Sequence, residues 1–423
     1  MKVLIVGSGA REHALVWKCV QSPLVERVYC APGNGGTGGM ARNVAVQADD
    51  VPGLVRFARR EKPGLAVLGP EAAVAAGVGD ALRDAGVPVF GPNREAGRIE
   101  SSKAFAKQLM KEAGIPAPDF GVFSEAEPAL SWARERGGRV AVKADGLALG
   151  KGVIVCDGEE AAGRAIDAML VTRSFGRAGS TVVIEERLEG PELSVFGITD
   201  GERVVPLVPA RDFKRARDGD GGPNTGGMGA YSPPAGVDAE VLREGIERVL
   251  EPAVRALKER GLEYQGVLYA GLMLTAGGIQ ALEFNARFGD PEAQVILPRL
   301  ESDLVVLMLA AARGDLSTAP PPRWSARTAV AIVVVCGGYP DGYETGSVVE
   351  GLTSIPPGVL MFHAGTRYAA GRGLVTSGGR VVTAVGLAET VADARLAALS
   401  GAVRVRFPGA FHRTDIAQEG VIG

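Results

Sequence analysis

Cysteine and histidine are scarce in this chain. Its 423 residues include only four cysteines and three histidines. The cysteines Cys19, Cys30, Cys156 and Cys336 lie far apart, and no C-x-x-C spacing occurs. Because a structural zinc site needs closely spaced cysteine and histidine ligands, this composition gives such a site little support. We expect buried, reduced thiols instead.

The chain also lacks long apolar runs and a strong excess of either charge. No run reaches the roughly 20 residues of a membrane-spanning helix, and the apolar run in MKVLIVGSG is too short for a signal peptide. Net charge is −3 with both signs interspersed, which argues against a nucleic-acid-binding surface. We therefore expect a cytoplasmic protein that binds neither membranes nor nucleic acid.

What the chain does contain is typical of a globular protein. Hydrophobic residues make up 46% and charged residues 22% of the sequence. The length suggests roughly two to four domains. Glycine is abundant, and the 60 glycines gather in a few loops where they become informative.

The first glycine cluster follows a predicted buried strand at residues 2–6 and precedes a helix that ends near Gln21. This arrangement points helix N-terminal N–H groups at an anion, as in dinucleotide-binding domains. Two details argue against a dinucleotide: Glu12 replaces the third glycine of G-x-G-x-x-G, and the next strand, 27–30, ends without an acidic residue. Arg11 suits the phosphate of a smaller ligand. The alternative is a tight turn needed only for packing.

Alternating helices and strands continue to about residue 100, which predicts a first domain built on a parallel sheet. Two short loops, 69–71 and 91–93, directly follow strands, where open parallel sheets bind ligands. The other elements predicted here are helices at 51–60 and 77–85 and strands at 65–68 and 87–90.

A second glycine cluster, residues 145–152, joins strands predicted at 139–144 and 153–156, after a helix at 103–113. Such a hairpin, carrying Lys151, can close over phosphates as a flap. It differs from the P-loop because Gly152 and a strand follow the lysine. Lys143 lies inside the first strand, where a buried lysine needs a partner. That partner is either a ligand phosphate or an internal salt bridge. Without ligand, we expect residues 144–152 to be mobile.

A third cluster spans residues 217–230 and contains six glycines. It is either a disordered linker or a loop that wraps a ligand. Its position between a strand near 203–208 and a helix at 239–260 favours the ligand loop. Asp212, Lys214 and Arg215 precede it and add charge.

The motif ALEFNARFGDPE, residues 281–292, places three polar residues in a regular pattern. Residues 266–274 and 279–288 are predicted to form a hairpin, with Glu283, Asn285 and Arg287 on one face of the second strand. Carboxylate and carboxamide oxygens are ligands that Mg²⁺ prefers, and an arginine suits a phosphate or carboxylate. Asp290 is expected to cap the next helix. The alternative is an edge strand whose polar face meets water.

After a proline-rich linker at 320–322, the chain predicts a last α+β domain that carries few clustered polar residues. Its predicted elements are strands at 328–336, 359–362 and 380–386 and a helix at 391–399.

Taken together, six motifs resemble the ATP-grasp ligases and, within them, the phosphoribosylamine–glycine ligase family: GSGAREHAL, APGN, GPE, KADGLALGKGV, GPNTGGMGAYSP and EFNARFGDPE. The resemblance covers nearly the whole chain and implies a multidomain α/β and α+β fold. Its parts would be an N-terminal parallel α/β (pre-ATP-grasp) domain at 1–100, a two-subdomain ATP-grasp core at 101–322 with a mobile flap subdomain at about 120–190, and a C-terminal α+β domain at 323–423.

The same resemblance implies a reaction. ATP, glycine and 5-phospho-β-D-ribosylamine (phosphoribosylamine) would give glycinamide ribonucleotide, ADP and phosphate through a glycyl phosphate, in de novo purine biosynthesis. Mg²⁺ or Mn²⁺ would be the cofactor, with ATP as co-substrate, and the protein would be a monomer or a weak homo-oligomer. The glycine carboxylate itself attacks ATP, so the protein has to position reactants, neutralise charge and exclude water.

Residue roles follow from positions that match the family motifs. Glu283 and Asn285 would hold the metal, and Arg287, Lys143 and Asp290 would assist the chemistry. The residues implied to bind ATP are Lys103, Lys143, Gly150, Lys151, Gly152, Glu185, Glu186, Leu188 and Glu192. Those implied to bind the other substrates are Gly9, Arg11, Glu71, Asp212, Lys214, Asn224, Thr225, Gly226, Gly227, Met228 and Arg287.

Three other functions fit this sequence less well than the ligase. A related ATP-grasp carboxylase would activate bicarbonate and usually offers two glutamates on its metal strand, whereas this chain has E-F-N. A non-catalytic ATP-binding regulator would be expected to have lost Lys143, Glu283 or Arg287, and all three are present. A nicotinamide-dependent oxidoreductase fits only the first strand–turn–helix unit and fails at Glu12.

Overall fold

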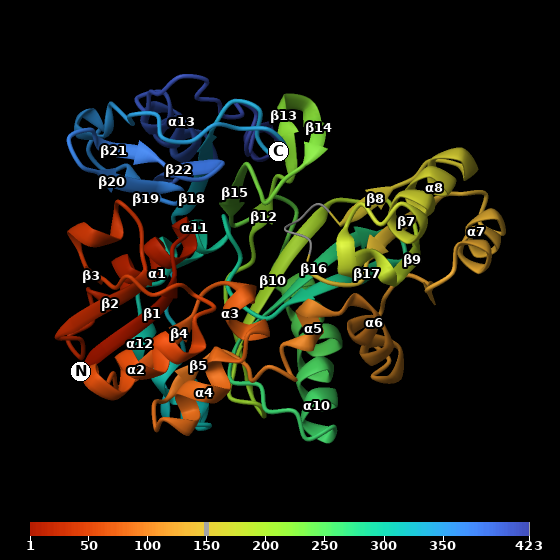
Figure 1. Ribbon diagram of the computed structural model, residues 1–423, viewed down its shortest axis with the longest axis horizontal. Helices are drawn as coiled ribbons and strands as arrows, with labels where there is room; N and C mark the ends of the chain where they lie inside the picture. The colour runs from red at the N-terminus through yellow and green to blue at the C-terminus, as the bar shows by residue number, and fades with distance from the viewer. Residues whose placement is uncertain (148–151, 423) are drawn as a thin grey trace.

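The computed structural model describes residues 1–147 and 152–422, and its N-terminal part is an open parallel sheet (Figure 1). The strand order is β3-β2-β1-β4-β5, and each neighbouring pair runs parallel, as predicted. The order reverses at β1, so the turns after β1 and β4 flank a switch point, where such sheets bind ligands. The strands are β1 (Lys2–Gly7), β2 (Arg27–Pro32), β3 (Arg42–Asn43), β4 (Leu65–Leu68) and β5 (Val89–Phe90).

Both faces of this sheet are covered, which explains why β1 is continuously apolar. Val3 and Ile5 belong to one hydrophobic core, while Leu4 and Val6 belong to another on the opposite face. Helices α1 (Ala10–Cys19) and α12 (Leu304–Ala312) supply residues to the first core, and α2 (Val51–Glu61) and α4 (Val78–Asp84) supply the second.

A four-stranded antiparallel sheet, ordered β11-β10-β16-β17, forms the middle of the molecule. β16 (Gly266–Thr275) and β17 (Gly278–Asn285) make the predicted hairpin, with Thr275 paired to Gly278. The helix predicted at 239–260 is interrupted by a π-helical turn at Ile246–Leu250. The other elements of this layer are α6 (Lys103–Glu112), β10 (Glu192–Thr199), β11 (Val204–Pro206), α9 (Ala239–Gly245) and α10 (Glu251–Glu259).

A smaller sheet, ordered β6-β9-β7-β8, has a hydrophobic core of its own that includes Val140, Val142 and Ile184. Together with α7 and α8 it projects at the right of Figure 1. The mobility expected for residues 144–152 falls in part on 148–151, which lie outside the described residues. The elements are β6 (Phe120–Phe123), α7 (Ala126–Arg134), β7 (Val140–Ala144), β8 (Val153–Val155), α8 (Glu159–Ile166) and β9 (Val182–Glu186).

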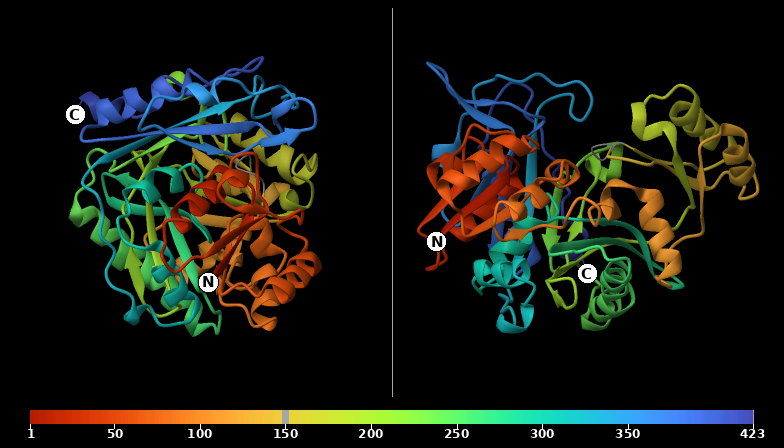
Figure 2. Two further views of the ribbon diagram at one scale, coloured as in Figure 1. Left: turned by 90° about the vertical axis from the view of Figure 1, so that its left-hand side faces the viewer. Right: turned by 60° about the horizontal axis from the view of Figure 1, so that its bottom comes forward.

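The last sheet is antiparallel, ordered β12-β15-β18-β22-β19, and draws on two distant parts of the chain. Two of its strands precede the central hairpin in sequence and three follow it. Figure 2 shows these C-terminal elements, in blue, lying against the red N-terminal ones. The elements are β12 (Arg211–Asp212), β15 (Gly229–Ser232), β18 (Thr328–Val335), β19 (Leu360–His363), β22 (Arg380–Ala388) and α13 (Val391–Ala402).

The third glycine cluster is not the continuous loop that the sequence predicted. β13 (Arg215–Arg217) and β14 (Gly221–Asn224) pair antiparallel, and β15 then joins the C-terminal sheet. Gly219 and Gly227, with φ of 67° and 111°, form turns between the strands, while Gly221, Gly222 and Gly229 lie within them.

Two local predictions in the 281–292 motif were wrong. β17 ends at Asn285 and its pairing shifts register by one residue opposite Gly271, so Arg287 lies beyond the strand. Asp290 does not cap a helix, because α11 (Ala293–Ile296) begins later. The Asp290 carboxylate instead accepts a hydrogen bond from Gln294 Nε2 at 2.7 Å.

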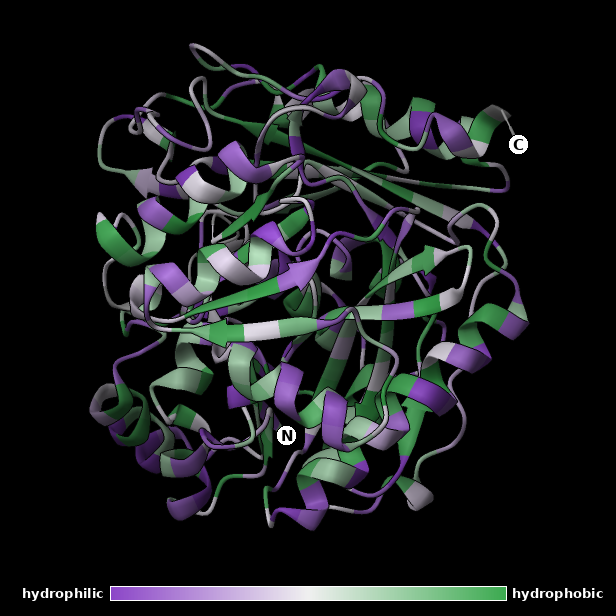
Figure 3. Ribbon diagram, turned by 90° about the vertical axis from the view of Figure 1, so that its right-hand side faces the viewer, coloured by the Kyte–Doolittle hydropathy of each residue, from purple (hydrophilic) through white to green (hydrophobic). Residues whose placement is uncertain are grey.

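The distribution of hydropathy agrees with this layered arrangement. Figure 3 shows hydrophobic residues along the strands and hydrophilic residues on the outer turns of the helices. All four cysteines are buried free thiols. Within residues 1–147 and 152–422, no helix is both long and apolar enough to cross a membrane.

Candidate active site

The end of strand β17 carries the predicted metal ligands into a group of lysines. Burial acts to raise the pKa of Glu283, but Lys143, Lys214 and Lys103 together outweigh it, and that pKa is lowered. Glu283 is therefore held as a carboxylate. Asn285 is buried, and its Oδ1 accepts a hydrogen bond from Arg287 Nη2 at 3.1 Å. An ionised carboxylate and a carboxamide oxygen at one strand end are a donor set that suits a hard divalent cation.

Arg287 lies between two carboxylates of the N-terminal region. Its Nη2 is 2.9 Å from Glu100 Oε1, and its Nε is 3.4 Å from Glu71 Oε2. Burial acts to lower the pKa of Arg287, but these two carboxylates raise it above its ordinary value. Glu100 also accepts the backbone N–H of Ala286 at 2.8 Å. The sequence did not identify Glu100, because no local pattern connects it with a residue 186 positions away.

The partner of Lys143 is a carboxylate of the flap. Lys143 Nζ lies 2.9 Å from Glu185 Oε2 and donates to the carbonyl of Leu282 at 3.3 Å. The internal salt bridge, one of the two alternatives for this lysine, is therefore present. Lys107 Nζ lies 3.1 Å from the same Glu185 oxygen, and Glu185 Oε1 is buried without a hydrogen-bond partner among the described residues. Burial lowers the pKa of Lys107 to about 8, against the pull of Glu185.

Four other residues implied to bind ATP lie on helix α6 and on or next to strands β8 and β9. Lys103, at the start of α6, donates to the carbonyl of Gly146 at 3.4 Å, and burial lowers its pKa. Glu186 is exposed at the end of β9, and Leu188 is half-buried just beyond it. Gly152 is buried, and its carbonyl accepts the N–H of Ala144 at 2.8 Å. Gly150 and Lys151 lie outside the described residues.

A second charged group contains Asp212, Lys214 and Glu192. Lys214 Nζ lies 3.1 Å from Asp212 Oδ1 and also pairs with Glu192. Burial acts to lower the pKa of Lys214, but these two carboxylates outweigh it and raise that pKa well above its ordinary value. Burial, with Glu292 and Glu192 nearby, raises the pKa of Asp212 to about 7. The structure thus joins Glu192, predicted for ATP, to Lys214, predicted for another substrate.

The glycine segment 224–228 is tied to the turn at Asp290 by Arg380 of strand β22. Arg380 Nη1 donates to the carbonyls of Gly226 at 2.6 Å and Asp290 at 2.7 Å. Gly227 packs so closely that a Cβ there would lie 2.4 Å from Pro291 Cδ. The C-terminal domain therefore reaches the site, although its sequence showed few clustered polar residues and gave no signal for Arg380.

Burial and two nearby arginines set the pKa of Asp290 at this turn. Burial acts to raise the pKa of Asp290, but Arg380 and Arg11 outweigh it and lower that pKa. Thr225 Oγ1 donates to the carbonyl of Lys214 at 2.8 Å. Met228 is fully buried in the C-terminal core, and its backbone N–H donates to Phe213 at 2.7 Å. The remaining member of the segment, Asn224, is half-buried and accepts from Arg215 Nη1 at 3.5 Å.

At the first turn, the Glu12 side chain folds back against the backbone of the turn. Its Oε2 accepts the backbone N–H of Gly9 at 2.5 Å, and its Oε1 is 2.6 Å from Arg11 Nε. A Cβ on Gly7 would lie 2.5 Å from Glu12 Cγ, and one on Gly69 2.1 Å from Glu12 Oε1. These contacts support the packing role of the turn. A phosphate contact by Arg11 stays a prediction.

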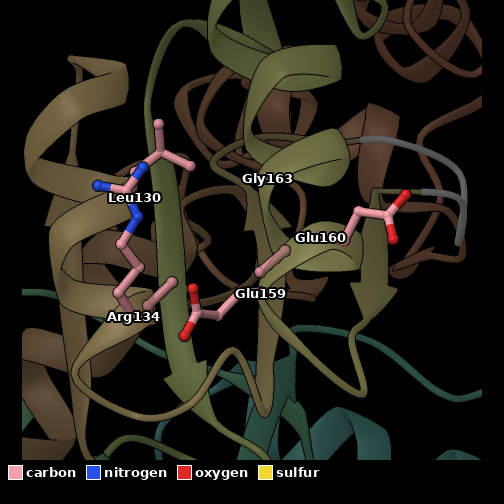
Figure 4. Close-up of a pocket in the computed structure, with 7 residues that line it drawn as sticks. Leu130, Arg134, Glu159, Glu160 and Gly163 are labelled. Carbon is pink, nitrogen blue, oxygen red and sulfur yellow. The ribbon is translucent and has the colours of Figure 1, made fainter.

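A surface hollow on the projecting sheet carries none of the predicted site residues. It has a volume of about 390 Å³ and opens between α7 and α8 (Figure 4). Its lining residues are Leu130, Ala133, Arg134, Glu159, Glu160, Ala162 and Gly163.

Three family profiles cover most of the chain. Residues 1–100 match the phosphoribosylglycinamide synthetase N domain, 101–293 the ATP-grasp (A) domain of that synthetase, and 329–419 its C domain. Phosphoribosylamine–glycine ligase of Allochromatium vinosum is 50% identical over 100% of this chain and 99% of its own length. The Salmonella typhimurium enzyme of the same name is 47% identical, with 98% of each chain covered.

Solved structures extend the similarity to three dimensions. Phosphoribosylamine–glycine ligase of Thermotoga maritima superposes with a TM-score of 0.86 and 34% identity, covering 99% of this chain and 100% of that one. The biotin carboxylase domain of Hydrogenobacter thermophilus 2-oxoglutarate carboxylase has a TM-score of 0.74 at 18% identity, covering 99% and 97%. At that identity the likeness shows the fold alone.

Proposed function

The chain belongs to the phosphoribosylglycinamide synthetase family, and from that premise we propose how its residues carry out the reaction. It is an ATP-dependent ligase that joins glycine to phosphoribosylamine, giving glycinamide ribonucleotide in purine biosynthesis. The observation that carries the residue assignment is the convergence of Glu283, Arg287 and the Lys143–Glu185 pair around the end of one strand.

Glu283 and Asn285 would hold Mg²⁺ or Mn²⁺. The fit rests on the ionised state of Glu283 and on the hard oxygen character of both side chains. A cation held by these two residues would supply the positive charge that neutralises the phosphates of ATP.

Lys143, Lys103 and the flap segment 150–152 would contact the phosphates of ATP. At the other end of the nucleotide, Glu185 Oε1, which is buried and has no hydrogen-bond partner within residues 1–147 and 152–422, is an acceptor suited to the adenine amino group. Backbone groups of Glu186 and Leu188 would read the adenine edge, and Glu192 would hold the ribose.

Arg287 would stabilise the phosphoryl group during its transfer to the glycine carboxylate. Two carboxylates fix its guanidinium in place before any substrate arrives, so little reorganisation is needed during the reaction. Closure of the flap would exclude water while the glycyl phosphate exists, because that anhydride hydrolyses readily.

The remaining substrates would bind around Asp290. This carboxylate is kept ionised by Arg380 and Arg11, which makes it a suitable partner for the ammonium group of glycine. Cations and backbone N–H groups from both sides of the turn would hold the sugar phosphate. The residues assigned to these substrates are Gly9, Arg11, Glu71, Asp212, Lys214, Asn224, Thr225, Gly226, Gly227, Met228 and Arg287.

We also propose the division into domains at 1–100, 101–322 and 323–423, with a flap subdomain at about 120–190. A cytoplasmic location and a monomeric or weakly associated state complete the proposal, with no nucleic acid or membrane as partner.

The test is ADP release from Mg-ATP with glycine, with and without phosphoribosylamine formed in situ from ribose 5-phosphate and ammonia. Turnover that needs both substrates, with glycinamide ribonucleotide identified by mass, is the expected result. Turnover with bicarbonate instead would keep the fold and overturn the substrates. Binding of ATP without any turnover would favour a regulator.

A further inference from the structure

Lys107 is a buried lysine to which the reaction described above gives no role. Its side chain is only 2% exposed and runs from helix α6 to the flap. Its Nζ lies 3.1 Å from Glu185 Oε2 and donates to the carbonyl of Ala281 at 3.1 Å. A buried ion pair is a weak source of stability compared with an apolar pair of the same size. Stability alone therefore does not explain why the charged side chains of Lys107 and Glu185 are buried together.

One carboxylate oxygen of Glu185 forms ion pairs with two lysines. Lys143 Nζ is 2.9 Å and Lys107 Nζ is 3.1 Å from Oε2, while Oε1 has no hydrogen-bond partner among the described residues. One carboxylate needs only one counter-ion. The pair of lysines thus contains one cation more than Glu185 requires, and one of them can leave.

The two lysines differ in the element that carries them. Both Nζ atoms donate to carbonyls of β17, Lys107 to Ala281 at 3.1 Å and Lys143 to Leu282 at 3.3 Å, but Lys107 belongs to helix α6, like Lys103. Lys143 lies on flap strand β7, next to the glycine segment that would close over phosphates. Lys143 is therefore the lysine that can exchange its carboxylate for a ligand.

We propose that Lys107 is a positioning residue for nucleotide binding: it stays on Glu185 Oε2 when Lys143 moves from Glu185 to the phosphates of ATP. The proposal rests on the phosphate role assigned to Lys143 above. Without Lys107, the departure of Lys143 would leave a buried carboxylate with no counter-ion, which is strongly unfavourable. With Lys107 in place, Glu185 stays paired and Oε1 stays free.

The protonation of Lys107 agrees with this exchange. Burial and, to a lesser extent, the neighbouring ammonium of Lys143 lower its pKa to about 8, against the opposing effect of Glu185. When Lys143 turns towards the phosphates of ATP, its repulsion of Lys107 falls. The pKa of Lys107 then rises, so Lys107 stays protonated while it is the remaining counter-ion of Glu185.

The test compares Lys107→Met with Lys111→Met, which removes an exposed lysine from the same helix. ATP binding is measured by calorimetry, and kcat and KM by ADP release. We expect Lys107→Met to weaken ATP binding by about tenfold or more, with kcat at saturating ATP and KM for glycine within about twofold of the parent protein. Lys107→Arg restores the charge and is expected to recover most of the ATP affinity. Unchanged ATP affinity in Lys107→Met, or an equal loss for all substrates, would overturn the proposal.

One further variant, Lys143→Met, separates this inference from the assignment of Lys143. If Lys143→Met leaves ATP binding unchanged, the phosphate role of Lys143 itself fails. If Lys143→Met weakens ATP binding and Lys107→Met does not, only the role of Lys107 fails. The double variant Lys107→Met/Glu185→Gln removes the buried negative charge, so we expect Lys107→Met to cost less ATP affinity in the Glu185→Gln background than in the parent. Additive losses would contradict the counter-ion role, and Lys107→Gln serves the same cycle if the methionine variant does not fold.

Discussion

His13 Nδ1 accepts a hydrogen bond from the backbone N–H of His363 at 2.8 Å, across 350 positions of the chain. The His13 ring is buried and lies edge-on to Phe362, with ring centroids 5.7 Å apart. The contact joins helix α1 to strand β19, so the two ends of the protein are held together by a neutral imidazole.

Acid should weaken this contact and the fold with it. Burial, with His363 nearby, lowers the pKa of His13 to about 3, and burial lowers the pKa of His363 to about 4. Unfolded histidines titrate near 6.5, so below that pH the unfolded chain binds more protons than the folded one. The contribution of these rings to the free energy of unfolding should therefore fall between about pH 6.5 and these folded values, by up to about 1.4 kcal/mol per pH unit for each ring. Urea unfolding followed from about pH 7.5 to about pH 5 measures the slope.

His13→Gln provides the comparison for this slope. The variant should be less stable at neutral pH, because it loses the ring contacts, but its stability should change less with pH, because one titrating ring is gone. An identical pH slope in both proteins would contradict the role of His13.

Glu283→Ala should abolish turnover while leaving the fold intact. A bound cation contributes several kcal/mol to phosphoryl transfer, so the loss should be about 100-fold or more. ADP release measures the rate, Mn²⁺ titration measures metal binding, and circular dichroism checks the fold. Gln280→Ala, on the same strand, should keep activity and metal binding. Normal ADP release by Glu283→Ala would remove this residue from the metal site.

Arg380→Met should impair the use of glycine and phosphoribosylamine more than the binding of ATP. The guanidinium donates to the Gly226 and Asp290 carbonyls and so fixes these two segments relative to each other. A shift of about 1 Å in a substrate-positioning element can cost about 100-fold in rate. Steady-state kinetics for each substrate measure the difference. Arg372→Met removes an exposed arginine of the same domain and should have no effect. Equal losses for all three substrates would point to a general loss of structure.

Gly227→Ala should destabilise the protein more than Gly219→Ala. Both glycines have positive φ, at 111° and 67°, so alanine is strained at either position. At Gly227 the new Cβ would also lie 2.4 Å from Pro291 Cδ, whereas Gly219 has open space. Overpacking of this kind typically costs about 1–3 kcal/mol. The difference between the unfolding free energies of the two variants measures the close approach together with the less favourable φ of Gly227, and equal values would show that Pro291 gives way.

The sequence predicted best where a regular pattern decided the structure. The apolar run of β1, the helix after it and the hairpin of β16 and β17 all follow from local periodicity and turn residues. Glu283 and Asn285 lie on the strand that their alternating pattern predicted, and their role as metal ligands stays a prediction. Glu12 argued against a dinucleotide, and the structure shows its side chain lying against Gly7 and Gly69.

The predictions failed where distant residues decide the local structure. Asp290 has the sequence of a helix cap, but Arg11 and Arg380 bring their charges to it from opposite ends of the chain. Arg380 and Glu100 were missed because each is a single charged residue in an ordinary segment. Only the fold reveals that Arg380 lies against Gly226, 154 positions away.

The C-terminal sheet contains strands from two distant parts of the chain, so removing the last part affects strands that come before it. Strand β15 pairs with β12 on one side and, through Gly229–Ser232, with β18 on the other, so a chain ending at residue 322 would keep β12 and β15 but leave the β18 side of β15 unpaired. A sheet edge of this kind exposes a row of backbone donors and acceptors that invites pairing with another chain. Cleavage after the proline-rich linker should therefore yield a fragment prone to aggregation. In the intact protein, the last hundred or so residues pair with the edge of β15 that this fragment would expose.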